Sequence, residues 1–482
     1  MGCGDTSSVI SQRYDGGQKP SVEAGTDEEL DARAPSERDA TPRPILKPDG
    51  SQEPNPACVN LQCQVKTCPN GGTTSISGIV FDPAGKNPLY NVAVFVPNTT
   101  PEPFEFGASC DTCSSLYTGS PVVSTLTDAK GVFKLDNVPV GEDIPLVVQV
   151  GKWRRQLTIA SVAECKDNPQ PNGMLRLPRN RAEGDIPKIA VSTGGADTLE
   201  CLLRRIGVDA SEYVPGGNAA GNIQVYHGQS YGNNGAAPNT SPAAPESPTS
   251  LWNSVESLSR YDIVLLSCEG DEVENMNQQA LHDYASSGGR VFASHFHYSW
   301  FNSGPYASEN LATWRDGSND IGDINTDIVT TLPNGMPFAK GVALKEWLAN
   351  VGALQNDKLR ISAARYNADV DATNTPSTEW IVAEQGSRAP GATQYLSFNT
   401  PTDALDNVGD QSGAMYCGRV VFSDLHVGAA SGDDKGRPVP TGCSTRDLSP
   451  QEAALEFMLF DLSSCIIPDE LPPVPPPVTP VI

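Results

Sequence analysis

The stretch from Tyr261 to Trp300 constrains the fold of this chain more than any other. Its first part, Asp262–Ser267, is a short apolar run with β-branched residues, which is typical of a buried parallel strand. Residues Asn275–Ser287 carry apolar side chains at helical spacing, and two glycines follow them. A second apolar run, Arg290–Ser294, comes next. A strand, a helix and a strand of this length predict a right-handed crossover within a parallel sheet.

Residues that can take part in catalysis or in ligand binding follow the ends of these two strands. Cys268 and Glu269 follow the first strand, and His295 and His297 follow the second. Ligands bind beyond the carboxyl ends of the strands in open parallel sheets. We therefore expect a functional site here, with Trp300 close to it.

Two histidines and a later strand end favour a metal site. His295 and His297 lie two residues apart on what is predicted as an extended segment, so their side chains would face the same way. Asp424 and His426 end a later strand, Gly418–Leu425, and can complete a four-ligand set. Imidazole and carboxylate suit Zn²⁺ or a similar divalent ion. The alternative is a hydrogen-bonded pocket lined by aromatic side chains, without an ion.

Cys268 is open to two interpretations. With a histidine near it, the thiol can act as an activated nucleophile, which would make Cys268, His295 and His426 a catalytic set. Glu269, His297 and Trp300 would then contact the ligand. The structural alternative is a buried cysteine or one half of a disulfide.

The charge and the cysteines indicate where such a chain can work. A formal net charge of −25 over 482 residues argues against binding nucleic acid, because phosphates repel an acidic surface. No apolar run approaches the length of a membrane helix, roughly 18 to 20 residues. Twelve cysteines favour disulfides in an oxidising compartment.

The cysteines divide unevenly between the two halves of the chain. Six fall between Cys58 and Cys165 and five between Cys201 and Cys465, so pairing within domains would leave one of the second set free. Cys443 and Cys465 bracket the last predicted helix and are a plausible pair. A zinc site is the competing interpretation for Cys110-x-x-Cys113.

The two ends of the chain look unlike its middle. Met1-Gly2-Cys3-Gly4 resembles the end of a bacterial lipoprotein signal, which implies a lipid anchor at Cys3, although no apolar segment precedes it. Residues 1–72 are predicted as a disordered tether with a cysteine-rich end, because they are polar and nearly free of aromatics. Residues 467–482 form a proline-rich, extended tail.

Residues 73–181 are predicted as a small all-β sandwich. Alternating strands flank turns such as Asp128-Ala129-Lys130-Gly131. The runs S-G-I-V-F-D-P-A-G-K-N-P-L-Y-N-V-A-V-F-V and T-D-A-K-G-V-F-K-L-D-N-V-P-V-G resemble the carboxypeptidase regulatory-like domains. The resemblance implies a transthyretin-like sandwich with a carbohydrate-binding-like fold, found on secreted and cell-surface proteins. It implies no peptidase activity, since the chain has no H-E-x-x-H motif.

Residues 188–466 are predicted as an α/β domain with a parallel sheet. The segments K-I-A-V-S-T-G-G, Y-D-I-V-L-L-S-C-E-G, Y-A-S-S-G-G-R-V-F-A-S-H and G-R-V-V-F-S-D-L-H resemble the class I glutamine amidotransferase-like fold, nearest its trehalose-utilisation-protein-like branch. That family places a nucleophilic Cys after the strand that corresponds to Arg290–Ser294. This chain has Ser294-His295-Phe296-His297 there, so the resemblance implies a domain without the nucleophile elbow.

Local patterns in this domain have simpler interpretations. Asp197 and Glu200 are predicted as the N-cap and N3 residues of a helix. The region between Trp300 and Asn356 is predicted as loops and short helices. Its acidic residues are interpreted as a solvated loop, with calcium binding as the alternative; they are Asp316, Asp320, Asp323 and Asp327.

Two functions are consistent with these features. The first is a surface-exposed binding protein, resembling predicted myxobacterial surface lipoproteins, with a degenerate amidotransferase-like domain that binds a carbohydrate or another cell-envelope component. The second is a hydrolase, metal-assisted or thiol-dependent, that uses the histidines at the strand ends. The two differ in geometry, because a hydrolase needs His295 or His297 within bonding reach of His426, Asp424 or Cys268.

Overall fold

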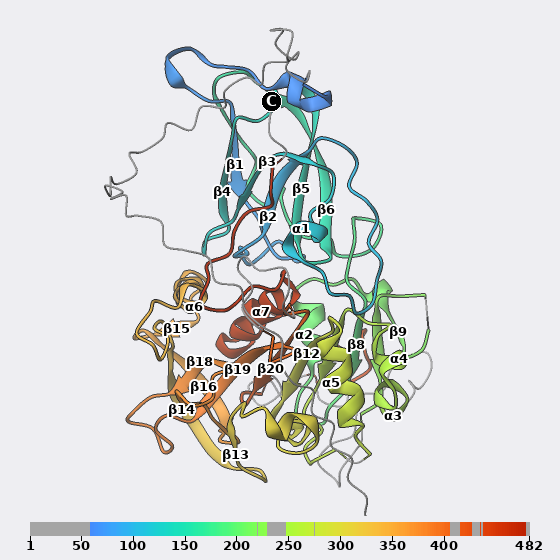
Figure 1. Ribbon diagram of the computed structural model, residues 1–482, viewed down its shortest axis with the longest axis vertical. Coiled ribbons are helices and arrows are strands. Elements are labelled where there is room, and N and C mark those ends of the chain that lie inside the picture. The colour runs from blue at the N-terminus through green and yellow to red at the C-terminus, as the bar shows by residue number, and fades with distance from the viewer. Residues whose placement is uncertain are drawn as a thin grey trace, which may run out of the picture. The chain divides into compact units, whose positions relative to one another are not determined.

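The computed structural model describes residues 58–218, 220–228, 247–273, 275–404, 415–426, 434 and 437–478. Residues Pro56–Ile482 group into one compact unit. The predicted lipid attachment at Cys3 and most of the predicted tether lie outside the described residues. The described chain is multi-domain and mostly β, with several sheets and few helices (Figure 1).

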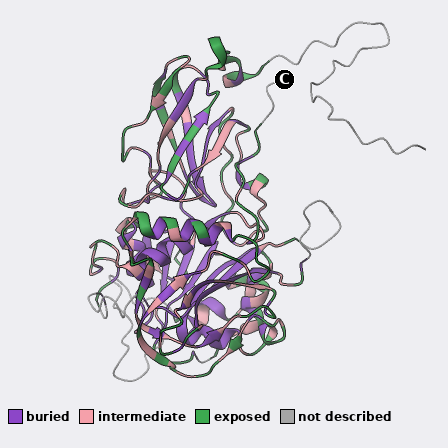
Figure 2. Cartoon of the chain, turned by 90° about the vertical axis from the view of Figure 1, so that its left-hand side faces the viewer, coloured by how far each residue is buried: buried purple, intermediate pink, exposed green. Residues whose placement is uncertain are grey.

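Two small sheets form from the residues before position 170. One has the order β4-β1-β7 and the other the order β3-β2-β5-β6. Their strands are β1 (Ser75–Ile79), β2 (Ala93–Pro97), β3 (Pro121–Leu126), β4 (Val132–Asp136), β5 (Gly141–Val150), β6 (Trp153–Val162) and β7 (Asp167–Pro169). Side chains of both sheets, such as Phe133 and Val148, belong to one apolar core, and Figure 2 shows how far burial extends along these strands. The transthyretin-like family type stays a prediction.

A larger sheet contains the strands from position 189 onward. Six of its neighbouring strands are parallel, in the order β9-β10-β8-β11-β12-β20. They are β8 (Ile189–Ser192), β9 (Tyr213–Pro215), β10 (Ile223–Tyr226), β11 (Ile263–Leu266), β12 (Arg290–Ser294) and β20 (Gly418–Ser423). β11 and β12 are the two strands expected between Tyr261 and Trp300, and they pair directly.

Antiparallel strands extend this sheet beyond β20. They are β13 (Thr313–Trp314), β14 (Asp320–Ile328), β15 (Leu354–Gln355), β16 (Lys358–Arg365), β17 (Ala368–Asp369), β18 (Ser377–Ala383) and β19 (Thr393–Thr400). The loop predicted around Asp320–Asp327 is therefore wrong, since β14 occupies it. Ile324 and Ile328 are buried, while Asp323 and Asp327 pair with cations of β16. The acidic composition concealed this strand.

The helices are mostly short. They are α1 (Cys113–Leu116), α2 (Leu199–Arg205), α3 (Thr249–Trp252), α4 (Val255–Leu258), α5 (Gln278–Ser286), α6 (Ala339–Asn350) and α7 (Pro450–Ser463), with 3₁₀ turns η1 (Asn60–Gln64), η2 (Pro69–Gly71), η3 (Ala210–Glu212), η5 (His295–Trp300) and η6 (Pro305–Ser308). Among the described residues, none of the helices has the length and apolar character needed to span a bilayer.

Helices α7 and α2 begin differently. At α7, Ser449 and Glu452 form a capping box. The cap predicted for α2 is wrong, because its N-cap is Thr198, one residue later than Asp197, and no side chain caps it. Asp197 instead accepts a hydrogen bond from Ser294.

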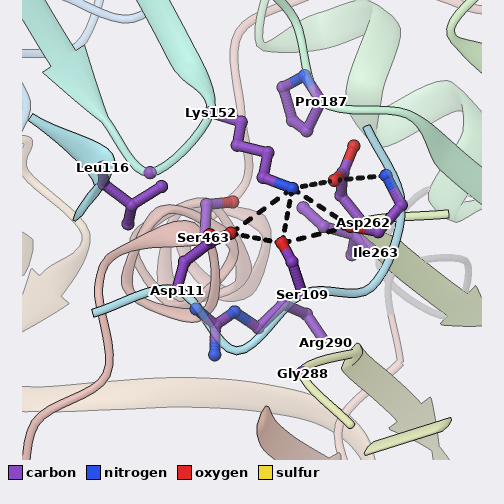
Figure 3. A pocket seen from close by; sticks show the side chains of 12 residues that line it. Ser109, Asp111, Leu116, Lys152, Pro187, Asp262, Ile263, Gly288, Arg290 and Ser463 are labelled. Carbon is purple, nitrogen blue, oxygen red and sulfur yellow. Dashed lines mark hydrogen bonds and ion pairs between the residues drawn. The ribbon is translucent and has the colours of Figure 1, made fainter. Parts of the chain in front are cut away.

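Helix α7 lies between the small sheets and the large one (Figure 1). Its Phe457 stacks on Tyr90 with 5.6 Å between ring centroids, and its Phe460 meets Trp153 at 5.8 Å. A buried lysine adds a polar contact. Lys152, in the turn between β5 and β6, places its Nζ 2.8 Å from Oδ1 of Asp262 and also binds Ser109 (Figure 3). The two groups of sheets are thus joined by apolar and ionic contacts.

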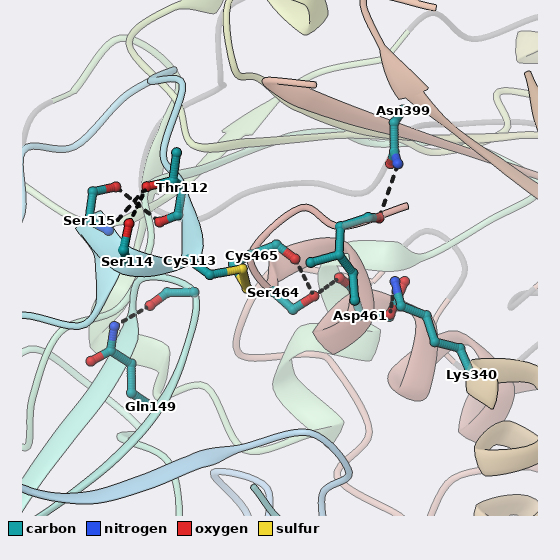
Figure 4. Close-up of a disulfide and its surroundings, with 12 residues drawn as sticks. Thr112, Cys113, Ser114, Ser115, Gln149, Lys340, Asn399, Asp461, Ser464 and Cys465 are labelled. Atoms are coloured by element: carbon teal, nitrogen blue, oxygen red, sulfur yellow. Dashed lines mark hydrogen bonds and ion pairs between the residues drawn. A yellow bond between two sulfur atoms is a disulfide. The ribbon is translucent and has the colours of Figure 1, made fainter. Parts of the chain in front are cut away.

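Five disulfides connect the described cysteines, and three of them span long stretches of sequence. They are Cys58–Cys63, Cys68–Cys165, Cys110–Cys417, Cys113–Cys465 and Cys201–Cys443. The pair predicted between Cys443 and Cys465 is wrong, as is the alternative zinc site at Cys110 and Cys113 (Figure 4). Spacing could not show the partners of Cys110 and Cys113, because these partners lie 307 and 352 residues further along the chain. Cys268 is left free.

A buried ion network ties the tail to the large sheet. Arg419 of β20 and Lys340 of α6 face Asp461 of α7 and Asp469 of the tail, with nitrogen-to-oxygen distances of 2.9–3.3 Å. Each of these side chains is at most 5% exposed. Burial alone would raise the pKa of Asp469, but Arg419 and Lys340 lower it to about 2. The predicted tail from 467 is therefore anchored at its start.

Removing one carboxylate of this network should destabilise the protein. We expect Asp469→Asn to lower the free energy of unfolding by about 3–5 kcal/mol at pH 7, because two buried cations lose part of their compensation. Asp357→Asn is the matched control, since it breaks an exposed pair with Lys345 and should cost less than about 1 kcal/mol. Urea denaturation followed by tryptophan fluorescence measures both, and equal effects would contradict the assignment.

A second buried pair consists of two carboxyl groups. Asp82 follows β1, and Glu456 belongs to α7 and accepts a hydrogen bond of 2.6 Å from Asn87. Burial raises the pKa of Asp82 to about 6, and burial together with Asp82 raises that of Glu456 well above its ordinary value. The folded protein therefore binds more protons here than the unfolded chain. As a result, the contribution of this pair to the free energy of unfolding falls as the pH rises from about 4 through 6.

Replacing one of the two carboxyl groups should reduce this pH dependence. We expect Glu456→Gln to be more stable than the wild type by about 1–3 kcal/mol at pH 8, and to differ little from it near pH 4. Urea unfolding at a series of pH values checks the prediction. A difference between the two proteins that does not change with pH would refute it.

Candidate functional site

Three candidate site residues meet beyond three adjacent parallel strands. Cys268 follows β11, His295 follows β12 and His426 follows β20, and β12 pairs with both of the other strands. One atom from each side chain lies within 4.8 Å of the others, and all three residues are buried. The sequence predicted these residues and this edge of the sheet.

His295 occupies a strained bend. Its φ is +45°, in the left-handed region that few residues other than glycine adopt. The chain turns there from β12 directly into η5. The bend at the end of β12 is therefore sharp, and it carries an imidazole.

Hydrogen bonds fix the tautomer of His295. Its Nε2 lies 3.2 Å from the carbonyl oxygen of Ser318, and a carbonyl can only accept, so Nε2 carries the proton. Its Nδ1 lies 3.3 Å from the sulfur of Cys268 and presents a lone pair there. This is the arrangement in which a histidine can bind a metal ion through one nitrogen while a carbonyl orients the ring through the other.

The sulfur of Cys268 lies in a mixed environment. Burial raises the pKa of the Cys268 thiol well above its ordinary value, and Asp197 raises it further. Hydrogen bonds from the backbone N–H groups of Phe296 and Gly270 lower it by a smaller amount. The thiol is therefore protonated at neutral pH, and Nδ1 of His295 accepts its proton in a hydrogen bond.

His426 completes the group. Its ring lies 4.7 Å from that of His295 at an angle of 87°, and its Nε2 is buried without a hydrogen-bond partner. Burial lowers the pKa of His426, and Asp197 opposes the shift in part. Burial, with His426 beside it, lowers the pKa of His295 to about 2. Both imidazoles are thus neutral at pH 7, which is the form that binds metals.

The donor set has a clear chemical preference. One sulfur and two imidazole nitrogens are ligands for zinc, copper and similar ions. The buried, unpartnered Nε2 of His426 supports this use, because a buried polar atom without a partner is costly. The cluster of Cys268, His295 and His426 could therefore hold a metal ion.

The structure places His297 and Trp300 outside this cluster. The segment His295–Trp300 is the 3₁₀ turn η5, so the prediction that His295 and His297 face the same way is wrong. Nε2 of His297 donates to the carbonyl of Ser267 at 3.0 Å, and its Nδ1 accepts from Nε1 of Trp300 at 3.0 Å. Burial lowers the pKa of His297 to about 4. Both nitrogens are in use, so His297 supports the turn.

Asp424 and Glu269 also lie outside the cluster. Oδ2 of Asp424 accepts from the backbone N–H of Asn367 at 2.6 Å, and burial raises the pKa of Asp424 to about 8. Glu269 is fully buried, with Oε1 3.3 Å from the hydroxyl of Ser192. The four-ligand set proposed from sequence therefore does not assemble around Asp424.

Asp197 is the neighbour that the sequence analysis missed. Its Oδ2 accepts a hydrogen bond of 2.6 Å from the hydroxyl of Ser294, and that hydroxyl accepts one of 2.9 Å from the backbone N–H of Cys268. Interpreting Asp197 as a helix cap concealed this position. The signal was available, since Asp197 also follows a strand of the same sheet, β8, after Gly194-Gly195.

Comparisons with known proteins give no information about the role of this site. No family model matches the chain, and no curated protein matches it. A cohesin–X–dockerin complex of type II from Acetivibrio cellulolyticus is 15% identical over 30% of this chain and 79% of that chain, with a TM-score of 0.15. A 9R-lipoxygenase from Cyanothece is 13% identical over 23% of this chain and 17% of its own, with a TM-score of 0.11. Similarity this low supports no conclusion about fold or function.

The burial of Cys268 leads to a prediction about thiol reactivity. In a Cys3→Ser background, we expect the folded protein to react very slowly with a disulfide reagent such as DTNB at pH 8. The thiol is shielded and protonated, so the reactive thiolate is scarce. One thiol per chain should react after unfolding in guanidinium without reductant. Rapid reaction of the native protein would show instead that Cys268 is accessible and activated.

Proposed function

We propose that this chain is a binding protein of the cell envelope or the exterior, whose α/β domain holds one transition-metal ion of the zinc class. The ligands are Cys268, His295 and His426. The observation that supports the proposal is the convergence of one sulfur and two imidazole nitrogens within 4.8 Å, in buried positions. Zn²⁺ or a similar divalent ion is the kind of metal that the sequence pattern suits at this edge of the sheet.

Support for the cellular setting comes from the disulfides. Five bonds among the described cysteines are typical of an oxidising compartment. The lipid anchor at Cys3 and a carbohydrate or other envelope component as the partner of the first domain belong to this proposal. So do the family types, a carboxypeptidase regulatory-like sandwich and an amidotransferase-like domain.

Metal-assisted hydrolysis is the second candidate function, and one observation favours it. Three protein ligands leave a further coordination position, which is the usual arrangement of catalytic zinc sites. A thiol-dependent reaction has less support, because burial keeps Cys268 protonated and His295 neutral. The set Cys268, His295 and His426 thus favours metal binding over nucleophilic catalysis.

Metal content tests the proposed function. We expect the zinc-supplemented and dialysed protein to keep about one equivalent of Zn²⁺, and the variants His295→Ala and His426→Ala to lose it. His282→Ala is the control, because that imidazole is bound to Glu309 outside the cluster. Elemental analysis measures all four proteins, with circular dichroism to verify folding.

The alternative outcomes are informative. Retention of the ion in His426→Ala would show that the ligands are not those named here. Absence of zinc, cobalt and copper from the folded wild type would refute the metal-binding function.

A further inference from the structure

The composition of the metal site bears on which ion it takes. Among the described residues, the ligand group consists of one cysteine and two histidines, with no carboxylate in it. A trigonal set of two imidazoles and one thiolate is the arrangement in which proteins bind copper in blue-copper sites. Structural zinc sites are almost always four-coordinate.

Building on the function proposed above, we propose that this site is a copper site of the Cys-His₂ class, in which Cu²⁺ is held by Cys268, His295 and His426. Binding replaces the thiol proton of Cys268 by the ion and releases that proton to solvent, so charge and atoms balance without an oxidant or a reductant.

The surroundings of the sulfur support copper. Backbone N–H groups of Phe296 and Gly270 hydrogen-bond to Cys268. Hydrogen bonds to the cysteine sulfur and an apolar environment are the features that tune copper–thiolate centres. The apolar side is present as well, since the ring of Phe296 lies 4.1 Å from that of His295 between centroids.

The two imidazoles are held differently, and both arrangements suit a trigonal ion. The carbonyl of Ser318 fixes the proton of His295 on Nε2, which leaves Nδ1 for the ion beside the sulfur. His426 approaches edge-on at 87° and has a buried Nε2 without a hydrogen-bond partner. The relative exposure of the three residues is between 0% and 2%.

A second layer of residues holds the backbone of Cys268 in place. The hydroxyl of Ser294 accepts from the backbone N–H of Cys268 and donates to Asp197, so the carboxylate acts on the ligand through the serine. Cys268 and His295 are thereby fixed from strands that pair directly, β11 and β12. A preformed set of this kind limits how far the ligands can rearrange to suit another metal.

Visible spectroscopy of the copper-loaded protein tests the inference. Full-length protein with Cys3→Ser and intact disulfides is titrated anaerobically with Cu²⁺ and, separately, with Zn²⁺. We expect one equivalent of copper to produce an intense thiolate-to-copper charge-transfer band. The band should be lost in Cys268→Ser and in His426→Ala, and kept in His282→Ala.

The outcomes separate this inference from the function it rests on. Zinc held at one equivalent by the same ligands, with copper giving no charge-transfer band or only oxidising the thiol, overturns the copper assignment and leaves the metal-binding function in place. No metal bound by folded wild type overturns both. A His295→Gln variant that folds but binds copper without the band supports the assignment even where Cys268→Ser fails to fold.

Discussion

Two disulfides constrain the protein more than any other interaction. Cys110–Cys417 and Cys113–Cys465 close loops of 307 and 352 residues and fasten one short segment to the residues before β20 and after α7. In the chain-entropy model, closing a loop of that length lowers the entropy of the unfolded chain by the equivalent of about 5–6 kcal/mol. The apolar contacts of α7 with the small sheets, and the placement of Lys152 against Asp262, then act between parts that are already held together.

The candidate site depends on the register in which its strands pair. Leu266 pairs with Ala293 between β11 and β12, so the residues two positions further on, Cys268 and His295, are brought opposite each other. Ser294 pairs with Ser423 of β20, which brings His426 to the same edge. A shift of one residue in either pair would turn these side chains to the other face of the sheet. The positions of the three candidate side chains are thus set by the buried strands behind them.

The sequence predicted the strands and strand-end residues that depend on local residue patterns. The strand Arg290–Ser294 was found as β12 with its predicted bounds, and Cys268, His295 and His426 were named because they follow apolar strands. The sequence did not reveal contacts between residues that lie far apart along the chain. Spacing could not reveal that Cys113 meets Cys465, and the local bend that makes His295–Trp300 a 3₁₀ turn separated His297 from the cluster. Asp197 was missed because a helix cap explained it locally.

The attachment of the proline-rich tail determines how the protein would respond to a pulling force. Its Pro476 accepts a hydrogen bond from Ser124 of β3, and near the other end of the described chain Asn60 and Gln62 bind Asn98, after β2. Both ends therefore attach to the small sheets, while Cys268, His295 and His426 lie in the long segment between them. A pulling force applied at the two ends would be borne first by these sheets and by Cys68–Cys165. The large sheet with its candidate site would stay outside the path of that tension.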